Sequence, residues 1–522
     1  MKRSKLFRIH LCIVTGLFLV LGNTGFAQLQ KSILLPAKLK SYVSYFNSID
    51  TETVKNYVSN ERAFDWLSSN IPLFECPDTT IEKIYYYRWW TFRKHLKQTP
   101  GGFVFTEFII PMNHAGKYNT ISSALGHHIY EGRWLRDPEY INDYITFWLY
   151  EDSKTDKPHL HNFSSWLQDA VYNQYLVTLD KPKLVANLPA LDADYRVWET
   201  ERQLPGGNFW QYDVRDAMEE SISGGRKVKN VRPTINSYMY GNAAAMMKMA
   251  RSAGNDTLQS VYQARANSIR FKVQHYLWND TASFFEARLE DGNFANAREE
   301  LGFIPWYFNL PADNAKYAKQ WDQLTDTKGF NAPWGITTAE RRHPGFRTHG
   351  TGHGCEWDGA IWPFATTQTL KGLANLLTAY KNHGTMSATV FYDELHKYAS
   401  AHQKNGKPYI GEYQDEKTGY WLKGDNPRSS YYNHSCFADL VINDLIGLKP
   451  REDNMLEVDP LIPSGKWDWF CLDKVMYHGK LLTILWDKSG SKYGKGKGLY
   501  IYSGGKEIYH GNELKNVLTK LN

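Results

Sequence analysis

Six long segments with helical hydrophobic spacing alternate with long irregular loops in the first 450 residues of this chain. The segments are 81–96, 238–251, 256–277, 362–380, 385–401 and 432–448. In 256–277, Leu258, Val261 and Ile269 follow a period near 3.6, which is typical of a helix. At about 35 residues per helix and loop, roughly twelve helices fit before residue 450. We therefore predict helical hairpins closed into a ring of six inner and six outer helices, an (α/α)6 toroid.

The loops between these segments carry many aromatic residues. They span 99–120, 203–236, 279–300, 327–358 and 405–430 and are rich in Gly, Pro, Trp and charge. Aromatic residues make up 15% of the chain, and several stand beside Gly, Pro or Asn in these loops. Long loops in a compact domain are usually functional, so we expect their aromatic rings to line a cleft rather than to fill a core.

The pattern changes after Pro450. Short β-like runs at 455–458, 480–486 and 498–502 are separated by Gly-rich turns. We therefore predict a mainly α protein with a catalytic toroid over 28–450 and a small C-terminal β-sandwich-like domain over 451–522.

The N-terminus has the features of a secretory signal. Basic residues occupy positions 2, 3, 5 and 8, an apolar stretch covers 11–21, and small residues precede a cleavage point after Ala27. The apolar stretch is short for a membrane span, and no other candidate span is visible. We predict a signal peptide over 1–27 and a periplasmic or secreted protein.

The predicted leader also explains the basic balance of the chain. The formal charge of +6 falls to +2 without 1–27, which holds four basic and no acidic residues. No long Lys/Arg run follows, so electrostatics do not support nucleic-acid binding.

The loop 203–236 holds the densest group of carboxylates and aromatic residues. Asp213, Asp216, Glu219 and Glu220 stand near Arg215, with Trp210 before them and Tyr240 after them. If a helix begins near Arg215, then Asp216, Glu219 and Glu220 share one face, and their mutual repulsion raises a carboxyl pKa. A carboxyl that is protonated near neutral pH is a general acid. The alternative is a solvated acidic helix start, which the flanking Trp, Tyr and Gly residues make the weaker interpretation.

A second group lies in 350–363, where Trp357, Asp358 and Trp362 follow several glycines. The indole rings can stack on sugars, and the carboxylate can accept hydrogen bonds from hydroxyl groups. His349, His353, Cys355 and Glu356 also permit a metal site, but their spacing matches no strong zinc signature, so we predict neither a metal nor another cofactor.

A third group surrounds Glu412, between Gly411 and Tyr413 and ahead of the turn Lys417-Thr418-Gly419. We expect Glu412 to be presented from a loop, and Glu416 to lie on the surface of the turn. Two separated carboxyl groups facing a sugar are the minimum that glycoside hydrolysis needs, one to protonate the leaving oxygen and one to activate water or attack carbon.

These motifs resemble those of the six-hairpin (α/α)6 glycoside hydrolases, in particular the trehalase, family 63 and mannosylglycerate hydrolase-like group. That group carries a segment of the type YWRGPIWP, which residues 356–363 match with Asp358 in place of Arg. Its late motif resembles E-x-Y-x-P-x-T-G, matched here by Glu412, Tyr413 and Thr418-Gly419. The resemblance covers about 80–450 and implies an inverting, metal-independent glycosidase with Glu412 as its general base.

The resemblance leaves the general acid open. The group's SGxDxS pattern, laid on 217–221, puts the acid at Glu219, whereas the rhamnosidase pattern DxPxRDE puts it at Asp216. Around these acids, we expect Trp210, Tyr240, Trp357 and Trp362 to shape the pocket and Arg215 and Asp358 to bind hydroxyl groups.

We therefore expect an exo-acting glycoside hydrolase with a carbohydrate substrate. Two alternatives remain: a polysaccharide lyase, which shares the helical toroid, and a glycan-binding protein without activity. The sequence does not indicate the sugar, the linkage or the oligomeric state.

Overall fold

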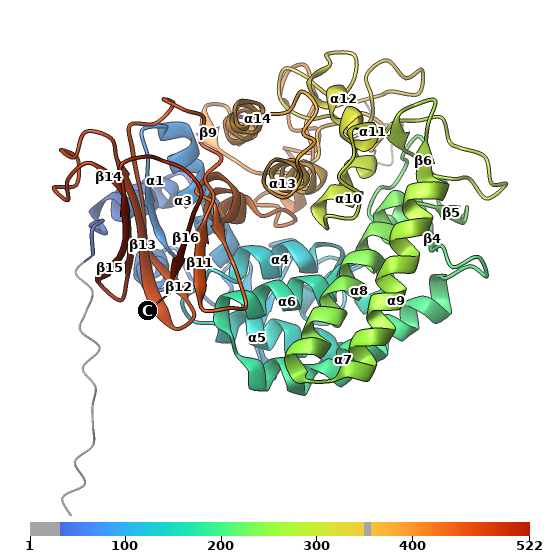
Figure 1. Ribbon diagram of the computed structural model, residues 1–522, viewed down its shortest axis with the longest axis horizontal. Helices are drawn as coiled ribbons and strands as arrows, with labels where there is room; N and C mark the ends of the chain where they lie inside the picture. The colour runs from blue at the N-terminus through green and yellow to red at the C-terminus, as the bar shows by residue number, and fades with distance from the viewer. Residues whose placement is uncertain (1–31, 349–356, 522) are drawn as a thin grey trace, which may run out of the picture.

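The computed structural model describes residues 32–348 and 357–521, which form a mainly helical body with a β-rich C-terminal part (Figure 1). The predicted signal peptide and the four residues considered for a metal lie outside the described residues. Within the described part, no helix is both long and apolar enough to cross a membrane.

Long helices form the body. Their bounds are α1 Ala37–Ser48, α2 Ala63–Asn70, α3 Thr79–Lys94, α4 Leu125–Gly132, α5 Glu139–Thr146, α6 Leu167–Thr178, α7 Lys181–Arg202, α8 Pro233–Ala253, α9 Asp256–Lys272, α13 Pro363–Ala379 and α14 Ala388–Ala401. Short helices α10 Ile304–Tyr307, α11 Ala315–Ala318, α12 Asp322–Thr325 and α15 Phe437–Asp439 complete it.

Local sequence sets several helix ends. The side chain of Asp78 accepts hydrogen bonds from the backbone amides of Thr80 and Ile81 at the start of α3. Pro233 begins α8, and Gly254 ends it with a positive φ of 74°. These capping residues explain why the predicted segments 81–96 and 238–251 are found close to their expected positions.

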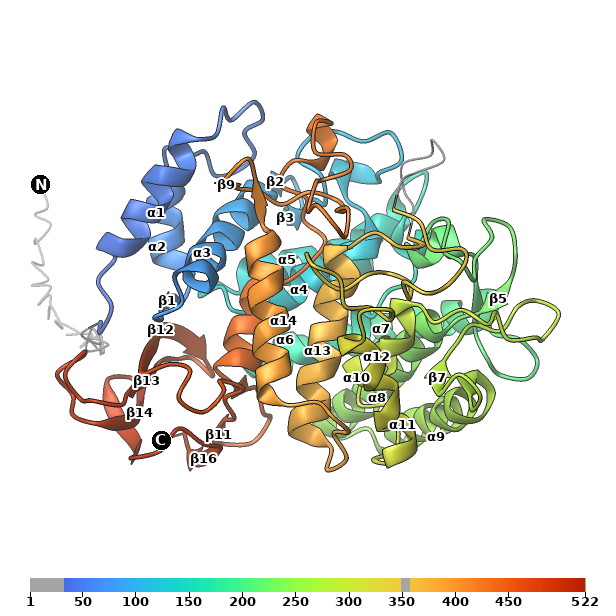
Figure 2. The ribbon, with the colours of Figure 1, turned by 90° about the horizontal axis from the view of Figure 1, so that it is seen from above.

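The packed helices make a circuit. Helix α3 contacts α14, and contacts continue through α13, α10, α8, α6 and α4 to α15, which returns to α3. Helices α7 and α9 pack against α8 from outside this circuit, as Figure 2 shows for α9. The circuit brings loops that are far apart in sequence to the same region.

The C-terminal part contains two antiparallel sheets. One has the order β10-β11-β16, from Leu448–Lys449, Met455–Val458 and Val517–Lys520. The other has the order β1-β12-β13-β14-β15, from Leu73–Glu75, Trp469–Tyr477, Lys480–Asp487, Gly498–Ser503 and Lys506–Gly511.

An N-terminal strand thus completes the C-terminal sheet. Strand β1 pairs with β12, with Phe74 opposite Leu472. The carboxylate of Asp473 in β12 also accepts hydrogen bonds from the backbone amides of Ile33 and Leu34 at 2.8 and 2.9 Å. These contacts fasten the beginning of the described chain to its last strands.

Two local predictions differ from the structure. No helix follows Arg215: a 3-10 helix, Asp213–Asp216, ends at Ala217, and Ala217 and Glu220 both have positive φ, 61° and 55°. The predicted helix 432–448 begins only at Phe437 and continues as a π-helix over Leu440–Leu445. In both places, irregular chain stands where a helix was predicted, and it reaches the candidate site.

Candidate active site

Loops from five parts of the chain converge on one cavity of about 540 Å³. Four of these parts belong to long loops expected from the sequence. Strand β3 spans Gly102–Phe105, and the loop that follows it contacts the segment that precedes α15. In this contact, the backbone amide of Asn433 donates a hydrogen bond to the carbonyl oxygen of Glu107 at 3.0 Å. The lining includes the predicted site residues Arg215, Glu219, Trp357, Trp362 and Glu412.

Glu412 is held by two cationic side chains. Its carboxylate accepts hydrogen bonds from Nη2 of Arg428 at 3.1 and 3.2 Å, and Nζ of Lys423 lies 3.1 Å from Oε2. The side chain of Glu412 is only 3% exposed, so these cations compensate a negative charge that water reaches poorly. The arrangement fixes the orientation of the carboxylate at the cavity wall.

Glu219 enters the same cavity from another loop. Its side chain is 25% exposed, and Oε2 lies 3.7 Å from Nη1 of Arg226. Its carbonyl oxygen accepts a hydrogen bond from the amide of Trp357 at 3.3 Å. The left-handed residues on either side, Ala217 and Glu220, turn the backbone so that Glu219 does not share a helix face with Asp216.

Stacked aromatic rings form one wall. The rings of Trp357 and Trp362 are 4.3 Å apart with an interplanar angle of 16°, and those of Trp362 and Phe364 are 4.5 Å apart at 9°. Tyr413 meets Trp357 edge-on at 5.0 Å. All three stacked rings line the cavity, which gives it the flat apolar surface expected for packing against a sugar ring.

A third carboxyl group, Glu107, lines the cavity and was not predicted from the sequence. Its oxygens accept hydrogen bonds from Oγ of Ser123 and from the hydroxyl group of Tyr432, both at 2.7 Å. Burial raises the pKa of Glu107 to about 7, and the nearby charge of Glu412 acts in the same direction. Its only sequence signal is a carboxylate that follows the apolar run Phe103–Phe105 after one threonine, a pattern common on protein surfaces.

Asp216 has a different place. It is fully buried and does not line the cavity, and its Oδ2 accepts a hydrogen bond from Nε of Arg232 at 2.9 Å. Burial raises the pKa of Asp216, while Arg232 opposes this effect. Of the two residues considered for the general acid, Glu219 alone lines the cavity.

Three of the residues expected to bind substrate do not line this cavity. Trp210 is buried, and the cations of Arg202 and Lys229 lie 4.9 and 4.8 Å from its ring. Tyr240 lies on α8, where its hydroxyl group accepts a hydrogen bond from Arg270. Asp358 forms an ion pair with Arg347.

Arg215 does line the cavity, near its edge. Its Nη1 donates a hydrogen bond to the carbonyl oxygen of Asn162 at 3.3 Å, and the guanidinium lies 5.9 Å from the ring of Phe163, which lines the same cavity. This contact joins the site to the neighbouring segment 161–163.

The expected surface position of Glu416 is wrong. The side chain is completely buried, and its Oε1 lies 3.5 Å from Nζ of Lys417. The turn folds back on the loop, as Gly419 packs its backbone against the indole ring of Trp334.

Among the residues that the structure describes, no group of three or more His, Cys, Asp or Glu could hold a metal ion.

This cavity combines acid, base and aromatic groups. Glu219 and Glu412 come from separate loops, and a stacked aromatic wall and a buried carboxyl group with a pKa near neutrality complete the lining. The set can bind a sugar ring and can donate and accept protons.

Comparison with known families gives two matches within the chain. Residues 117–435 match the family described as mannosylglycerate hydrolase MGH1-like glycoside hydrolase domain. Residues 448–509 match the glycosyl hydrolase family 65 C-terminal domain. The first match contains Glu219 and Glu412, and the second covers most of the predicted β domain.

Solved structures agree in fold. A protein named sialidase is 49% identical with a TM-score of 0.90, and the match covers 93% of this chain and 45% of that one. A family 63 mannosylglycerate hydrolase from Thermus thermophilus, in complex with glucose, has 13% identity and a TM-score of 0.52 over 68% of this chain and 98% of its own. A family 78 rhamnosidase from Bacillus sp. GL1 has 12% identity and a TM-score of 0.58 over 80% and 40%.

An uncharacterized protein of Borreliella burgdorferi is 24% identical over 205 residues. The match spans 39% of this chain and 41% of that protein, so the chain corresponds to less than half of this relative and of the sialidase-named structure.

Proposed function

The chain belongs to the mannosylglycerate hydrolase MGH1-like glycoside hydrolase family, and we propose that it is an exo-acting, inverting glycosidase. Glu219 is the general acid that protonates the leaving glycosidic oxygen. Glu412 is the general base that takes a proton from the attacking water. The observation that carries this proposal is that both carboxyl groups line one cavity although they stand on loops far apart in sequence.

The surroundings of the two residues support these roles. Arg428 and Lys423 contact the carboxylate of Glu412 and orient it at the cavity wall, as a general base requires. Glu219 is more exposed, at 25% of its side chain, and lines the cavity, so it can reach a substrate oxygen. Trp357, Trp362 and Phe364 offer a stacking surface, and a cavity rather than a surface groove suits the end of a glycan chain.

We also propose the finer architecture that the sequence predicts. The closed circuit of helices supports an (α/α)6 toroid, and export follows if residues 1–27 are removed as a signal peptide. An N-terminus at Gln28 in the protein recovered from its native envelope or medium would support export, and an intact Met1 would contradict it.

Product analysis tests the proposed reaction. The purified protein is incubated with a panel of neutral and acidic oligosaccharides, and the first product is followed by proton NMR to record its anomeric form. Hydrolysis with release of one terminal sugar in the inverted configuration is expected. A retained configuration would contradict inversion, an unsaturated product absorbing in the near ultraviolet would indicate a lyase, and binding without any product would indicate a glycan-binding protein.

A further inference from the structure

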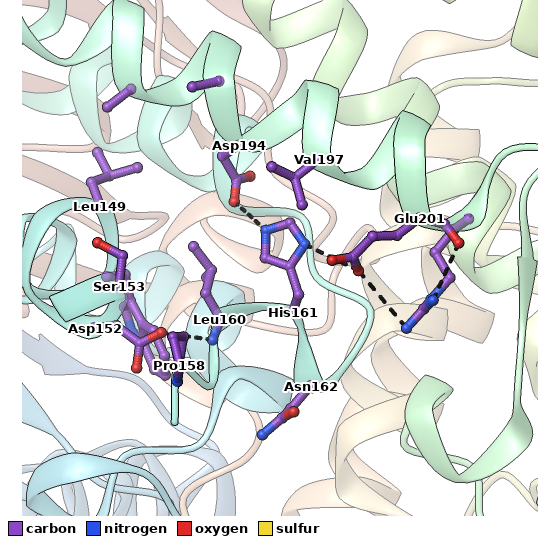
Figure 3. Close-up of a pocket in the computed structure, with 14 residues that line it drawn as sticks. Leu149, Asp152, Ser153, Pro158, Leu160, His161, Asn162, Asp194, Val197 and Glu201 are labelled. Atoms are coloured by element: carbon purple, nitrogen blue, oxygen red, sulfur yellow. Dashed lines mark hydrogen bonds and ion pairs between the residues drawn. The ribbon is translucent and has the colours of Figure 1, made fainter. Parts of the chain in front are cut away.

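A second cavity, of about 590 Å³, lies beside α7 (Figure 3). It shares no lining residue with the candidate active site. One wall is a stripe of α7 that includes Ala193, Asp194, Val197 and Glu201. The facing wall comes from the segment 148–162 that follows α5. Volumes of several hundred cubic ångströms are typical of small-molecule sites.

The polar centre of this cavity is His161. Its Nε2 lies 2.8 Å from Oδ1 of Asp194, its Nδ1 lies 3.7 Å from Oε2 of Glu201, and its ring stacks on Trp198 at 4.5 Å and 12°. Figure 3 shows the imidazole between the two carboxylates that α7 supplies. The ring is therefore fixed in place before any ligand arrives.

Apolar side chains surround this polar centre and remain accessible. Val197 is 40% exposed although it lies at a cavity wall, and Leu149 and Ala193 are also partly or fully exposed. A wall of this kind packs against the C–H face of a sugar ring. His161, Asn162 and Ser153 also line the cavity and can form hydrogen bonds with hydroxyl groups.

The charges of the cavity favour an uncharged ligand. Asp152, Asp194 and Glu201 outnumber Arg202 among the permanently charged lining groups, which disfavours an anion. Two of these carboxylates already have close partners. Oδ2 of Asp152 accepts hydrogen bonds from the backbone amides of His159 and Leu160 at 2.8 and 2.9 Å, and Asp194 accepts a hydrogen bond from Gln168 at 2.8 Å and contacts His161. A cation bound at Asp194 would therefore have to displace His161 or Gln168.

The cavity also shares a wall with the candidate active site. His161 and Asn162 line the second cavity, the next residue, Phe163, lines the first, and Arg215 at the edge of the first donates its hydrogen bond to the carbonyl oxygen of Asn162. We propose that this second cavity is a binding site for a neutral oligosaccharide, separated from the catalytic cavity by the segment 161–163. The binding proposal stands independently of hydrolysis.

Direct binding to the full chain tests this proposal. The Glu412→Gln variant is titrated by calorimetry with maltotriose, cellotriose, mannotriose and xylotriose, and with trigalacturonate and spermine as charged probes. Val197→Trp fills the cavity, and Val185→Trp is the matched control because Val185 is a 43% exposed valine of α7 outside the cavity. Ala193→Trp provides a second filling variant should the first fail to fold.

The proposal predicts that at least one neutral trisaccharide loses about tenfold or more in affinity, or loses one of two binding sites, in a filling variant but not in Val185→Trp. Equal binding of every neutral sugar by the filled and control variants would overturn it. So would the absence of binding by all four at millimolar concentration, or a dependence on Val197 seen only for trigalacturonate or spermine. Because no turnover is measured, failure here leaves the proposed hydrolysis untouched, and failure of hydrolysis leaves this result untouched.

Discussion

The backbone amide of Trp357 donates a hydrogen bond to the carbonyl oxygen of Glu219 at 3.3 Å. This bond joins the loop that carries the proposed acid to the loop that carries the aromatic wall. The position of Glu219 therefore depends on a segment more than a hundred residues later in the chain, and the two loops present one surface to the cavity.

The roles of Glu219 and Glu412 can be separated by the leaving group. Glu412→Gln should lower kcat by about a hundred- to ten-thousand-fold on every substrate, because no group then takes the proton from water. Glu219→Gln should be comparably impaired on natural glycosides but much less so on dinitrophenyl glycosides, whose leaving group needs no protonation. Steady-state kinetics on both substrate types measure this, and equal losses in both variants would contradict the assignment of the acid.

Glu107 should make the folded state less stable as pH rises. Its pKa is about 7 in the folded protein and about 4.3 in an unfolded chain, so the native state holds more protons between these values, and stability falls across that window. Glu107→Gln cannot ionise and should gain stability relative to the parent by up to about 3 kcal/mol between about pH 5 and about pH 8. Urea unfolding at the two pH values tests this, and a constant difference between the two proteins would contradict it.

Asp216→Asn should destabilise the fold rather than act on chemistry alone. The substitution leaves the buried guanidinium of Arg232 without its ionic partner, at a cost of about 3 kcal/mol. Glu219→Gln keeps the shape of a side chain that is 25% exposed, so its melting temperature should stay close to that of the parent. Thermal unfolding of both variants, with circular dichroism at low temperature, makes the comparison. An unchanged melting temperature for Asp216→Asn would argue against its structural role.

Gly359 should tolerate no side chain. A Cβ atom there would lie 2.1 Å from the carbonyl oxygen of Arg347, so Gly359→Ala must displace the backbone beside Trp357 and Asp358, and we expect a loss of about 1–3 kcal/mol. Gly206→Ala is the control, because nothing lies within 4 Å of the added atom and Gly206 has no positive φ. The free energy of unfolding, measured by chemical denaturation, and kcat/KM should both fall for Gly359→Ala. Equal stability of the two variants would contradict the packing argument.

Periodicity in the sequence was sufficient to predict helices and strands that are specified by their own residues. The segments 256–277 and 455–458 correspond to α9 with its π-helical extension and to β11, because their apolar spacing and their boundary residues agree. The same reasoning failed after Arg215, where local composition favours a helix but Ala217 and Glu220 adopt left-handed conformations within a packed loop. Loop conformation of this kind depends on tertiary contacts.

The candidate site was predictable only in part for a related reason. Glu412 and the Trp357–Trp362 pair stand in motifs with several distinctive neighbours, and the structure brings them to one cavity. Glu107 has no such neighbours, because its importance comes from Ser123 and Tyr432, which reach it through folding. Trp210 and Tyr240 stand near the acidic cluster in the sequence, yet neither lines the cavity. Their rings contact the guanidinium groups of Arg202 and Arg270 instead.

The pairing of β1 with β12 places a condition on how this protein can be made. During synthesis β1 emerges long before β12, so the five-stranded sheet cannot be completed until the last part of the chain has left the ribosome. A shortened chain that lacks residues 1–75 would leave the edge of β12 without its partner strand. Expression of this shortened chain should therefore yield an aggregating product unless residues 32–75 are supplied in the same cell.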